Sequence, residues 1–191
     1  MFALVVWFAV IAQYVLMLNN AAAPPTETTI RFFTFFTILT NTLVAVYFTV
    51  RSFSNAMMEK PGILTAVTVY ITIVGLVYQV LLRQLWQPTG LQKIVDELLH
   101  SVNPILVIVY WMLYEKKRAV QYRQILTWLI YPLIYFVVIF IRGVVSGWYP
   151  YPFIDVASIG IGQTLLNAVM LLVFFALVAA VYIFTGKKLS R

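Results

Sequence analysis

Residues 157–185 read ASIGIGQTLLNAVMLLVFFALVAAVYIFT, a run of 29 residues without a charged side chain. A helix that spans the hydrocarbon core of a bilayer needs roughly 20 mainly apolar residues. The run therefore predicts a transmembrane helix that is long enough to tilt or to continue beyond the lipid. Its apolar residues do not show the alternation with polar residues that is typical of a membrane β-strand.

Further segments of the same kind precede this one, and together they predict a membrane-embedded chain. Hydrophobic residues make up 63% of the 191 residues and charged residues 10%, whereas a soluble domain carries roughly 25% charged residues. We predict an all-α, polytopic membrane protein with one integral-membrane domain over residues 1–191, built as a bundle of six transmembrane helices. The predicted spans are Phe2–Leu18, Phe32–Val50, Gly62–Leu82, Leu98–Tyr114, Gln124–Ile141 and Ala157–Thr185.

Basic residues in the loops favour one orientation of this bundle. One side of the membrane receives nine of them, namely Arg51, Lys60, Lys116, Lys117, Arg118, Arg123, Lys187, Lys188 and Arg191. The other side receives four, namely Arg31, Arg83, Lys93 and Arg142. Because basic loops stay in the cytoplasm, we predict that the N- and C-termini are cytoplasmic. This bias accounts for the net charge of +7, so we expect membrane lipids and no nucleic acid as partners. The oligomeric state is left open.

The residue inventory excludes several kinds of chemistry. The chain has no cysteine and one histidine. It therefore has no disulfide, thiolate nucleophile, zinc–thiolate site or iron–sulfur cluster. A single histidine cannot supply paired axial haem ligands or a two-histidine zinc motif. We expect neither a metal nor a cofactor.

His100 lies two residues into the fourth predicted span, just after Asp96-Glu97. An ionisable group inside a membrane helix is costly and marks a candidate functional site. A histidine that is hydrogen-bonded to a neighbour, or that lies at the level of the headgroups, would give the same pattern. The sequence leaves both interpretations open.

The second predicted span carries a row of hydroxyl and amide side chains. Thr34, Thr37 and Asn41 follow at i, i+3 and i+7, which places them on one face of a helix. Packing between membrane helices also explains such residues. This span and the fourth both enter from the outer side, so Thr37 and His100 are expected at a similar depth. A neutral histidine within reach of a threonine hydroxyl can activate it as a nucleophile.

Arginines and aromatic residues mark the outer ends of other spans. Arg142 ends the fifth and Arg83 the third, where each could bind a carboxylate or phosphate or extend to the interface. Tyr135 lies roughly on the same stripe as Arg142. Residues 148–153, WYPYPF, are either part of an interfacial aromatic belt or a lid over an opening between helices.

Three segments resemble the androgen-induced membrane hydrolase family, including its bacterial six-helix branch. They are Phe35-Phe36-Thr37, Leu98-Leu99-His100 with Pro104 shortly after, and Gly147-Trp148-Tyr149-Pro150-Tyr151-Pro152-Phe153-Ile154-Asp155. The resemblance runs from the first predicted helix to the last. It implies a multi-pass protein of the bacterial plasma membrane that hydrolyses lipid esters, such as fatty acid esters of hydroxy fatty acids.

The resemblance also implies roles for individual residues. Thr37 matches the nucleophile and His100 the histidine that acts as general base. Beyond this resemblance, we expect from their places in the sequence that Asp155, Asn103 or Asp96 orients the imidazole and that Arg142 or Arg83 holds an anionic group. The further substrate-binding candidates are Asn41, Asn103, Tyr135, Trp148 and Asp155. The alternatives are a non-catalytic protein that binds or transports a lipid or small molecule, and a structural membrane subunit.

The orientation can be tested directly because the chain contains no cysteine. We expect Ser146→Cys to react with an impermeant thiol reagent on intact cells. Lys117→Cys should react only after the cells are opened, because basic loops stay in the cytoplasm. Mass-tagging of the recovered protein measures both reactions, and the reverse pattern would overturn the predicted topology.

Overall fold

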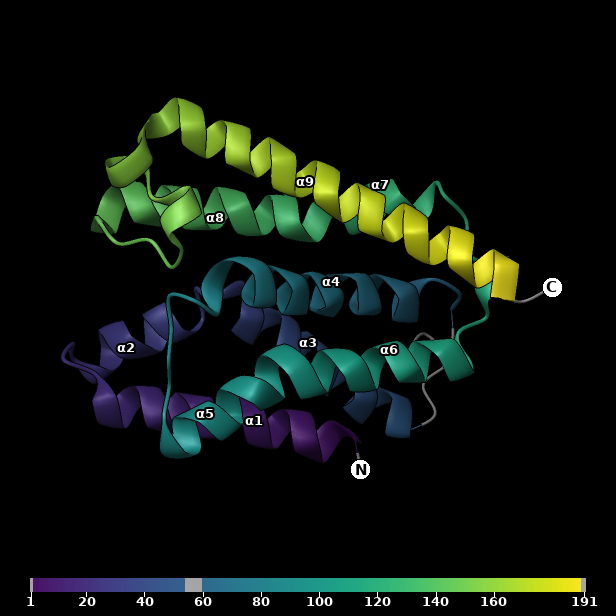
Figure 1. Ribbon diagram of the computed structural model, residues 1–191, viewed down its shortest axis with the longest axis horizontal. Coiled ribbons are helices and arrows are strands. Elements are labelled where there is room, and N and C mark those ends of the chain that lie inside the picture. Colours follow the sequence, from purple (N-terminus) through teal and green to yellow (C-terminus); the bar gives the residue numbers. More distant parts are fainter. Residues whose placement is uncertain (1, 54–59, 190–191) are drawn as a thin grey trace.

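The computed structural model describes residues 2–53 and 60–189, and over these residues it consists of helices and loops without a strand (Figure 1). The long helices are α1 (Phe2–Asn20), α3 (Phe36–Ser52), α4 (Ile63–Val77), α6 (Asn103–Tyr114), α8 (Ile130–Ser146) and α9 (Val156–Leu189). The short helices are α2 (Pro25–Phe32), α5 (Gly90–Glu97) and α7 (Gln124–Trp128). The tight and wide turns are the π-helical η2 (Tyr78–Leu82) and η3 (Leu98–Val102) and the 3-10 helical η4 (Lys117–Ala119) and η5 (Pro152–Ile154).

The all-helical membrane class is confirmed. Five helical stretches are long and apolar enough to cross a bilayer, and a sixth is added if the bent pair α2 and α3 counts as one span. The prediction of one continuous helix over Phe32–Val50 is wrong. The chain breaks between α2 and α3, whose axes differ by 71°. Thr34 lies in this break, so it does not share a helix face with Thr37 and Asn41.

Other predicted boundaries differ in detail. The fourth apolar stretch begins at Gly90 and runs through the wide turn η3 to Tyr114, and the fifth continues from Gln124 to Ser146. The last stretch covers Val156–Leu189 and contains a non-helical residue, Gly160, with φ of 76° and ψ of 159°. A positive φ of this kind is open to glycine at little cost, so the predicted final span is kinked near its start.

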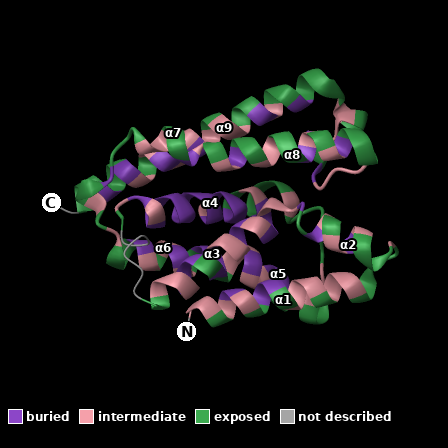
Figure 2. Cartoon of the chain, turned by 180° about the vertical axis from the view of Figure 1, so that it is seen from behind, coloured by how far each residue is buried: buried purple, intermediate pink, exposed green. Residues whose placement is uncertain are grey.

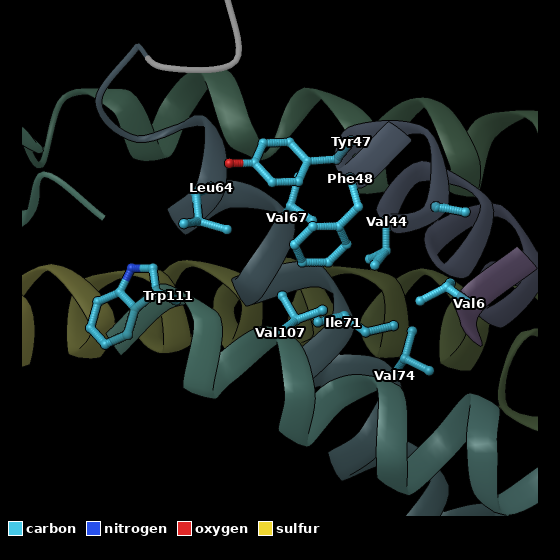
Figure 3. Packing of buried hydrophobic residues seen from close by; sticks show 11 residues of the cluster. Val6, Val44, Tyr47, Phe48, Leu64, Val67, Ile71, Val74, Val107 and Trp111 are labelled. Carbon is cyan, nitrogen blue, oxygen red and sulfur yellow. The ribbon is translucent and has the colours of Figure 1, made fainter. Parts of the chain in front are cut away.

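Helix α4 is the centre of the bundle. In the stretch Ile63–Leu82, which comprises α4 and η2, 67% of the most apolar 18 residues are buried, compared with 17% for α1 and 17% for Gln124–Ser146, which comprises α7 and α8. Figure 1 shows α8 and α9 on one side of α4, and α1, α3, α5 and α6 on the other. Figure 2 shows α4 as the most continuously buried element. One core cluster joins Val67 and Ile71 of α4 to Val44 of α3, Val107 of α6 and Val6 of α1 (Figure 3).

Large apolar side chains cover the outward faces of the long helices. Exposed examples are Ile11, Val15, Ile134, Val138, Val145, Leu165, Val169, Val173, Leu177 and Val181. Water-soluble monomers rarely expose contiguous apolar surface on this scale. The outer surface is therefore suited to hydrocarbon, while the polar side chains gather inside the bundle and at its ends.

The break between α7 and α8 follows from a proline. Pro132 has no N–H and cannot bond to Trp128 O, four residues earlier. The hydroxyl of Tyr70 donates to that carbonyl at 2.7 Å. Without water in the bilayer, each freed backbone group needs such a partner. The break between α7 and α8 is thus stabilised by α4.

The N-terminal end of α1 and the C-terminal end of α9 lie toward the same end of the bundle (Figure 1). A chain that crosses the membrane an even number of times has both termini on the same side. Which end faces the cytoplasm stays a prediction from the loop charges. Arg191, which contributes to that count, lies outside the described residues.

Glu115, directly after α6, holds the start of α4. Its carboxylate accepts hydrogen bonds from the backbone N–H of Thr65 at 2.9 Å and from the Thr65 hydroxyl at 2.8 Å. The first N–H groups of a helix have no partner within the helix and carry a partial positive charge. Trp111 of α6 completes the contact by donating its Nε1–H to Thr65 Oγ1 at 2.9 Å.

We expect Glu115→Ala to lower the free energy of unfolding by about 1–3 kcal/mol, because it leaves amide and hydroxyl donors at the start of α4 without an acceptor. Titration of the purified protein from mild detergent into a denaturing detergent measures the loss. Glu97→Ala is the control, since Glu97 makes a partly exposed ion pair with Arg83 of a kind worth about 0–1 kcal/mol. Equal losses in the two variants would show that Glu115 does not cap α4.

Candidate functional site

Two cavities meet at the start of α3. The larger has a volume of about 720 Å³ and lies among α1, α2, α3, the wide turns η2 and η3, and the loop after α8. The smaller has a volume of about 80 Å³, has mostly apolar walls and lies among α4, α8 and α9. Thr37 and His100 both line the larger cavity. Thr37, Leu82 and Tyr151 line both cavities.

Thr37 is placed by the break between α2 and α3. It is the second residue of α3, directly after the turn formed by Phe33–Phe35, and it is 9% exposed. The N–H groups of Phe36 and Thr37 are therefore at the helix start, where no intrahelical acceptor is available. The phenol of Tyr151 is a neighbour of this helix start, and Tyr151 lines both cavities together with Thr37. A continuous helix over this region would have withdrawn both amides.

The position of His100 is set by the wide turn η3, which Pro104 follows closely in the sequence. In η3 the N–H of Asn103 bonds to Leu98 O instead of to Leu99 O. The next donor that could reach Leu99 O in such a turn would belong to Pro104, which has no N–H. Asn41 of α3 supplies the missing bond, because its Nδ2 donates to Leu99 O at 3.2 Å. Wide turns of this kind are frequent at functional sites.

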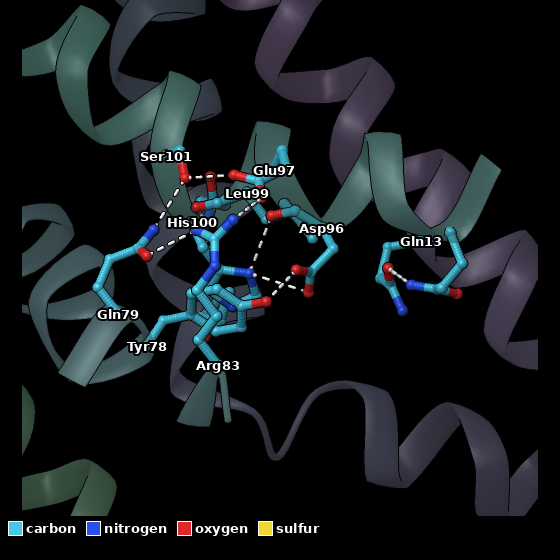
Figure 4. Close-up of polar contacts among 12 residues, drawn as sticks. Gln13, Tyr78, Gln79, Arg83, Asp96, Glu97, Leu99, His100 and Ser101 are labelled. Carbon is cyan, nitrogen blue, oxygen red and sulfur yellow. Dashed lines mark hydrogen bonds and ion pairs between the residues drawn. The ribbon is translucent and has the colours of Figure 1, made fainter. Parts of the chain in front are cut away.

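An aspartate and a tyrosine hold the imidazole (Figure 4). His100 Nδ1 lies 3.2 Å from Asp96 Oδ1 and 3.0 Å from Asp96 O. The ring stacks on Tyr78, with centroids 3.9 Å apart and planes 12° apart. The Tyr78 hydroxyl donates to Asp96 Oδ2. Because Nδ1 is engaged by Asp96, Nε2 is the nitrogen left for a molecule in the cavity. Of the three orienting candidates, the structure places Asp96 at the imidazole.

Asn41 and Asn103 join the backbones that carry Thr37 and His100. Asn41 Nδ2 donates to Thr37 O at 2.9 Å as well as to Leu99 O, and Asn103 Nδ2 donates to Asn41 Oδ1 at 2.8 Å. Both side chains are fully buried, and neither lines a cavity. Their position indicates that they hold the two segments in register instead of contacting a substrate.

No hydrogen bond joins Thr37 to His100 within the part of the chain that the structure describes. The two side chains line the same cavity, which agrees with the similar depth that the sequence predicts for them. Catalytic hydrogen bonds are often long or unformed until a substrate is bound. The larger cavity gives a bound molecule access to both side chains.

The predicted anion-binding arginines lie elsewhere. Arg142 donates to Glu27 Oε1 at 3.0 Å and lies over the ring of Trp148. Arg83 forms an ion pair with Glu97 and donates a hydrogen bond to Gln79 Oε1 at 2.7 Å. Neither arginine lines either of the two cavities described above.

Arg31 is the arginine in the wall of the larger cavity. Its Nε donates to Glu27 Oε1 at 2.6 Å, and its guanidinium lies 4.9 Å from the centroid of the Trp148 ring. Sequence reasoning assigned Arg31 only to the outer-side charge count. Its proximity to the cavity results from the bend between α2 and α3, which no sequence pattern announced.

The remaining candidates have defined places. Tyr135 lines the smaller cavity and donates to Thr34 O at 2.8 Å. Trp148 packs edge-on against Phe35, with centroids 5.9 Å apart. Asp155 caps α9, because Oδ1 accepts the N–H of Ala157 at 3.0 Å and Oδ2 accepts the hydroxyl of Ser158. It does not contact His100 and lines neither cavity.

Sequence reasoning missed Tyr78 and Tyr151. Tyr78 stands in a predicted span, where a tyrosine carries no distinctive signal. Tyr151 belongs to the aromatic loop, and Pro150, Tyr151 and Pro152 all line the larger cavity. The loop thus forms part of the cavity wall, as the lid interpretation expects.

Over residues 2–53 and 60–189, no three His, Cys, Asp or Glu side chains are grouped as metal ligands. Comparison of the chain with protein-family models, with curated proteins and with solved structures found no match.

The role of Asn41 is tested by Asn41→Leu, which keeps the size of the side chain. We expect the free energy of unfolding to fall by about 1–3 kcal/mol, because Leu99 O and Asn103 Nδ2 lose their buried partner. The neighbouring variant Thr42→Val is the control, since the buried Thr42 Oγ1 has no partner, so its removal breaks no hydrogen bond and should not lower the free energy of unfolding. If Asn41→Leu is as stable as the parent, the bridge does not hold the two segments together.

Proposed function

We propose that this protein is an integral-membrane hydrolase of lipid esters, with Thr37 as the nucleophile and His100 as the general base. One observation carries the proposal: Thr37 and an imidazole held by Asp96 line the same cavity of about 720 Å³. A hydroxyl, an imidazole and a carboxylate in this relation form the usual set for acyl transfer. The resemblance of three sequence segments to membrane hydrolases supports the same reaction.

In this proposal Thr37 Oγ attacks the ester carbonyl, and His100 Nε2 takes the hydroxyl proton. The carbon–oxygen bond to the alcohol breaks, the alcohol leaves with the proton from His100, and the acyl group stays on Thr37. Water then attacks the acyl group with His100 again as base, which releases the fatty acid and restores the hydroxyl. Asp96 stabilises the imidazolium that forms in each half of the reaction.

The walls suggest how the substrate is held. Apolar side chains line the larger cavity, including Leu16, Phe32 and Leu99. Phe136 and Phe175 contribute to the smaller cavity. The hydrocarbon arms of an ester at Thr37 would lie in these two spaces, and the polar side of the larger cavity contains Arg31. This arrangement suits fatty acid esters of hydroxy fatty acids or related lipids taken from the surrounding membrane.

A non-catalytic lipid-binding protein would use the same cavities without the chemistry. A fluorophosphonate probe separates the two functions, because only an activated hydroxyl forms a covalent bond with it. Labelling that disappears in Thr37→Ala supports the hydrolase. Saturable, reversible lipid binding without labelling supports the binding protein.

Turnover of a long-chain fatty acid ester of a hydroxy fatty acid by purified variants tests the catalytic pair. Thr37→Ala should abolish turnover with little loss of folding, and Thr37→Ser should keep part of it because an attacking oxygen remains. The turnover of His100→Ala should fall about as far as the turnover of Thr37→Ala. The turnover of the double variant should be little lower than that of either single variant, since the effects of residues that act as one unit are not additive.

Thr49→Ala is the matched control, because Thr49 lies on the same helix, donates to Ala45 O and lines neither cavity. It should retain the parent rate. Hydrolysis by Thr37→Ala at the parent rate would exclude Thr37 as the nucleophile.

A further inference from the structure

The loop between α8 and α9 places one tyrosine at the junction of the two cavities. This loop, residues 147–155, folds back along the bundle instead of extending away from it (Figure 1). Tyr151 is 9% exposed and lines both cavities together with Thr37. Any ester carbonyl that reaches Thr37 must therefore also approach Tyr151.

The phenol of Tyr151 lies among groups of the kind that form an acyl-transfer site. Its electrostatic neighbours are the hydroxyl of Thr37 and the backbone at Thr37 and Phe36, and Tyr151 and Thr37 line both cavities together. The amides of Phe36 and Thr37 stand at the start of the 17-residue helix α3, where the helix dipole favours negative charge. The hydroxyl of Tyr135 is a further neighbour. The backbone carbonyl of Thr34 binds Tyr135 in turn.

Aromatic packing fixes the Tyr151 ring. It stacks on Phe153 with planes 5° apart and centroids 5.2 Å apart. Phe35 lies edge-on to it, with centroids 5.9 Å apart. The hydroxyl is thus held in place before a substrate arrives, and such preorganised donors stabilise charge that develops in a transition state. Burial raises the pKa of the Tyr151 phenol, so the phenol keeps its proton near neutral pH and remains a donor.

We propose that Tyr151 is a catalytic residue, whose hydroxyl donates a hydrogen bond to the oxyanion formed when Thr37 attacks an ester. The proposal rests on the hydrolase function proposed above and supplies its oxyanion donor. As the carbonyl carbon becomes tetrahedral, the carbonyl oxygen gains the negative charge. In this proposal that oxygen accepts hydrogen bonds from the Thr37 N–H and the Tyr151 O–H. When the carbon–oxygen bond to the alcohol breaks, the carbonyl re-forms and the hydrogen bond weakens.

Tyr151→Phe removes the hydroxyl and keeps the ring. Loss of one oxyanion donor lowers kcat by about 10²–10³-fold in other acyl-transfer enzymes, and we expect a fall of this size with a much smaller change in KM. The rate of covalent labelling by the fluorophosphonate probe should fall in parallel, because the phosphoryl oxygen uses the same donors. A purely structural role of the hydroxyl would lower the melting temperature without this separation of kcat from KM.

Tyr149→Phe is the matched control in the same loop. Tyr149 packs against Gly143 and lines neither cavity, so its hydroxyl should be dispensable for kcat. If Tyr151→Phe does not fold, a difluorotyrosine at position 151 keeps the hydroxyl and the ring but makes the phenol more acidic. Its activity should then be lost at lower pH than that of the parent, because only the protonated phenol donates.

The outcomes distinguish this proposal from the one on which it rests. If the parent hydrolyses esters and depends on Thr37, but Tyr151→Phe keeps the parent kcat and labelling rate, Tyr151 is not the oxyanion donor and the hydrolase function stands. An unchanged pH profile of the fluorinated protein overturns the role of Tyr151 in the same way. If the parent neither hydrolyses esters nor reacts with the probe, both proposals fail.

Discussion

The structure depends on the requirement that every backbone polar group within a bilayer has a partner inside the protein. Regular helices meet this requirement by themselves. This chain interrupts its helices in several places, and at each of two interruptions a side chain from a neighbouring helix takes the freed carbonyl. Asn41 binds Leu99 O, and Tyr70 binds Trp128 O. The irregular turns therefore tie helices together at the points where they would otherwise be weakest.

The same requirement explains why the candidate site is found at the irregular turns. Non-helical backbone at membrane depth is tolerated where it is buried in protein or lines a cavity. The start of α3 exposes amides beside Thr37, and the wide turn η3 presents His100 to the same cavity. Asn41 bonds to both segments. One buried amide thus satisfies the broken backbone and sets the relative positions of the two candidate catalytic residues.

The sequence predicted the helical membrane class and a similar depth for Thr37 and His100, because apolar run length and depth from the interface follow directly from residue order. It predicted one helix through Phe33–Phe35 because these aromatic residues are as apolar as those of a span. Their break depends on tertiary packing, which no local pattern records. Asp96 was one of three candidates for orienting the His100 imidazole, because a choice among the three requires distances between helices. Tyr151 was recognised only as part of an aromatic loop, because alternation of proline and aromatics does not show which ring turns inward.

The wide turn at η3 also constrains how the chain can change length. A π turn corresponds to one residue more than an α-helical turn needs, and each residue of an α-helix turns the chain by roughly 100°. Deleting one residue between Leu98 and Pro104 would restore a regular helix and rotate every residue before it by about that angle. His100 would leave the cavity, and Asn41 would lose Leu99 O as an acceptor. Among natural variants of this fold, gaps and insertions at this position should therefore be accompanied by a change of the histidine or of Asn41.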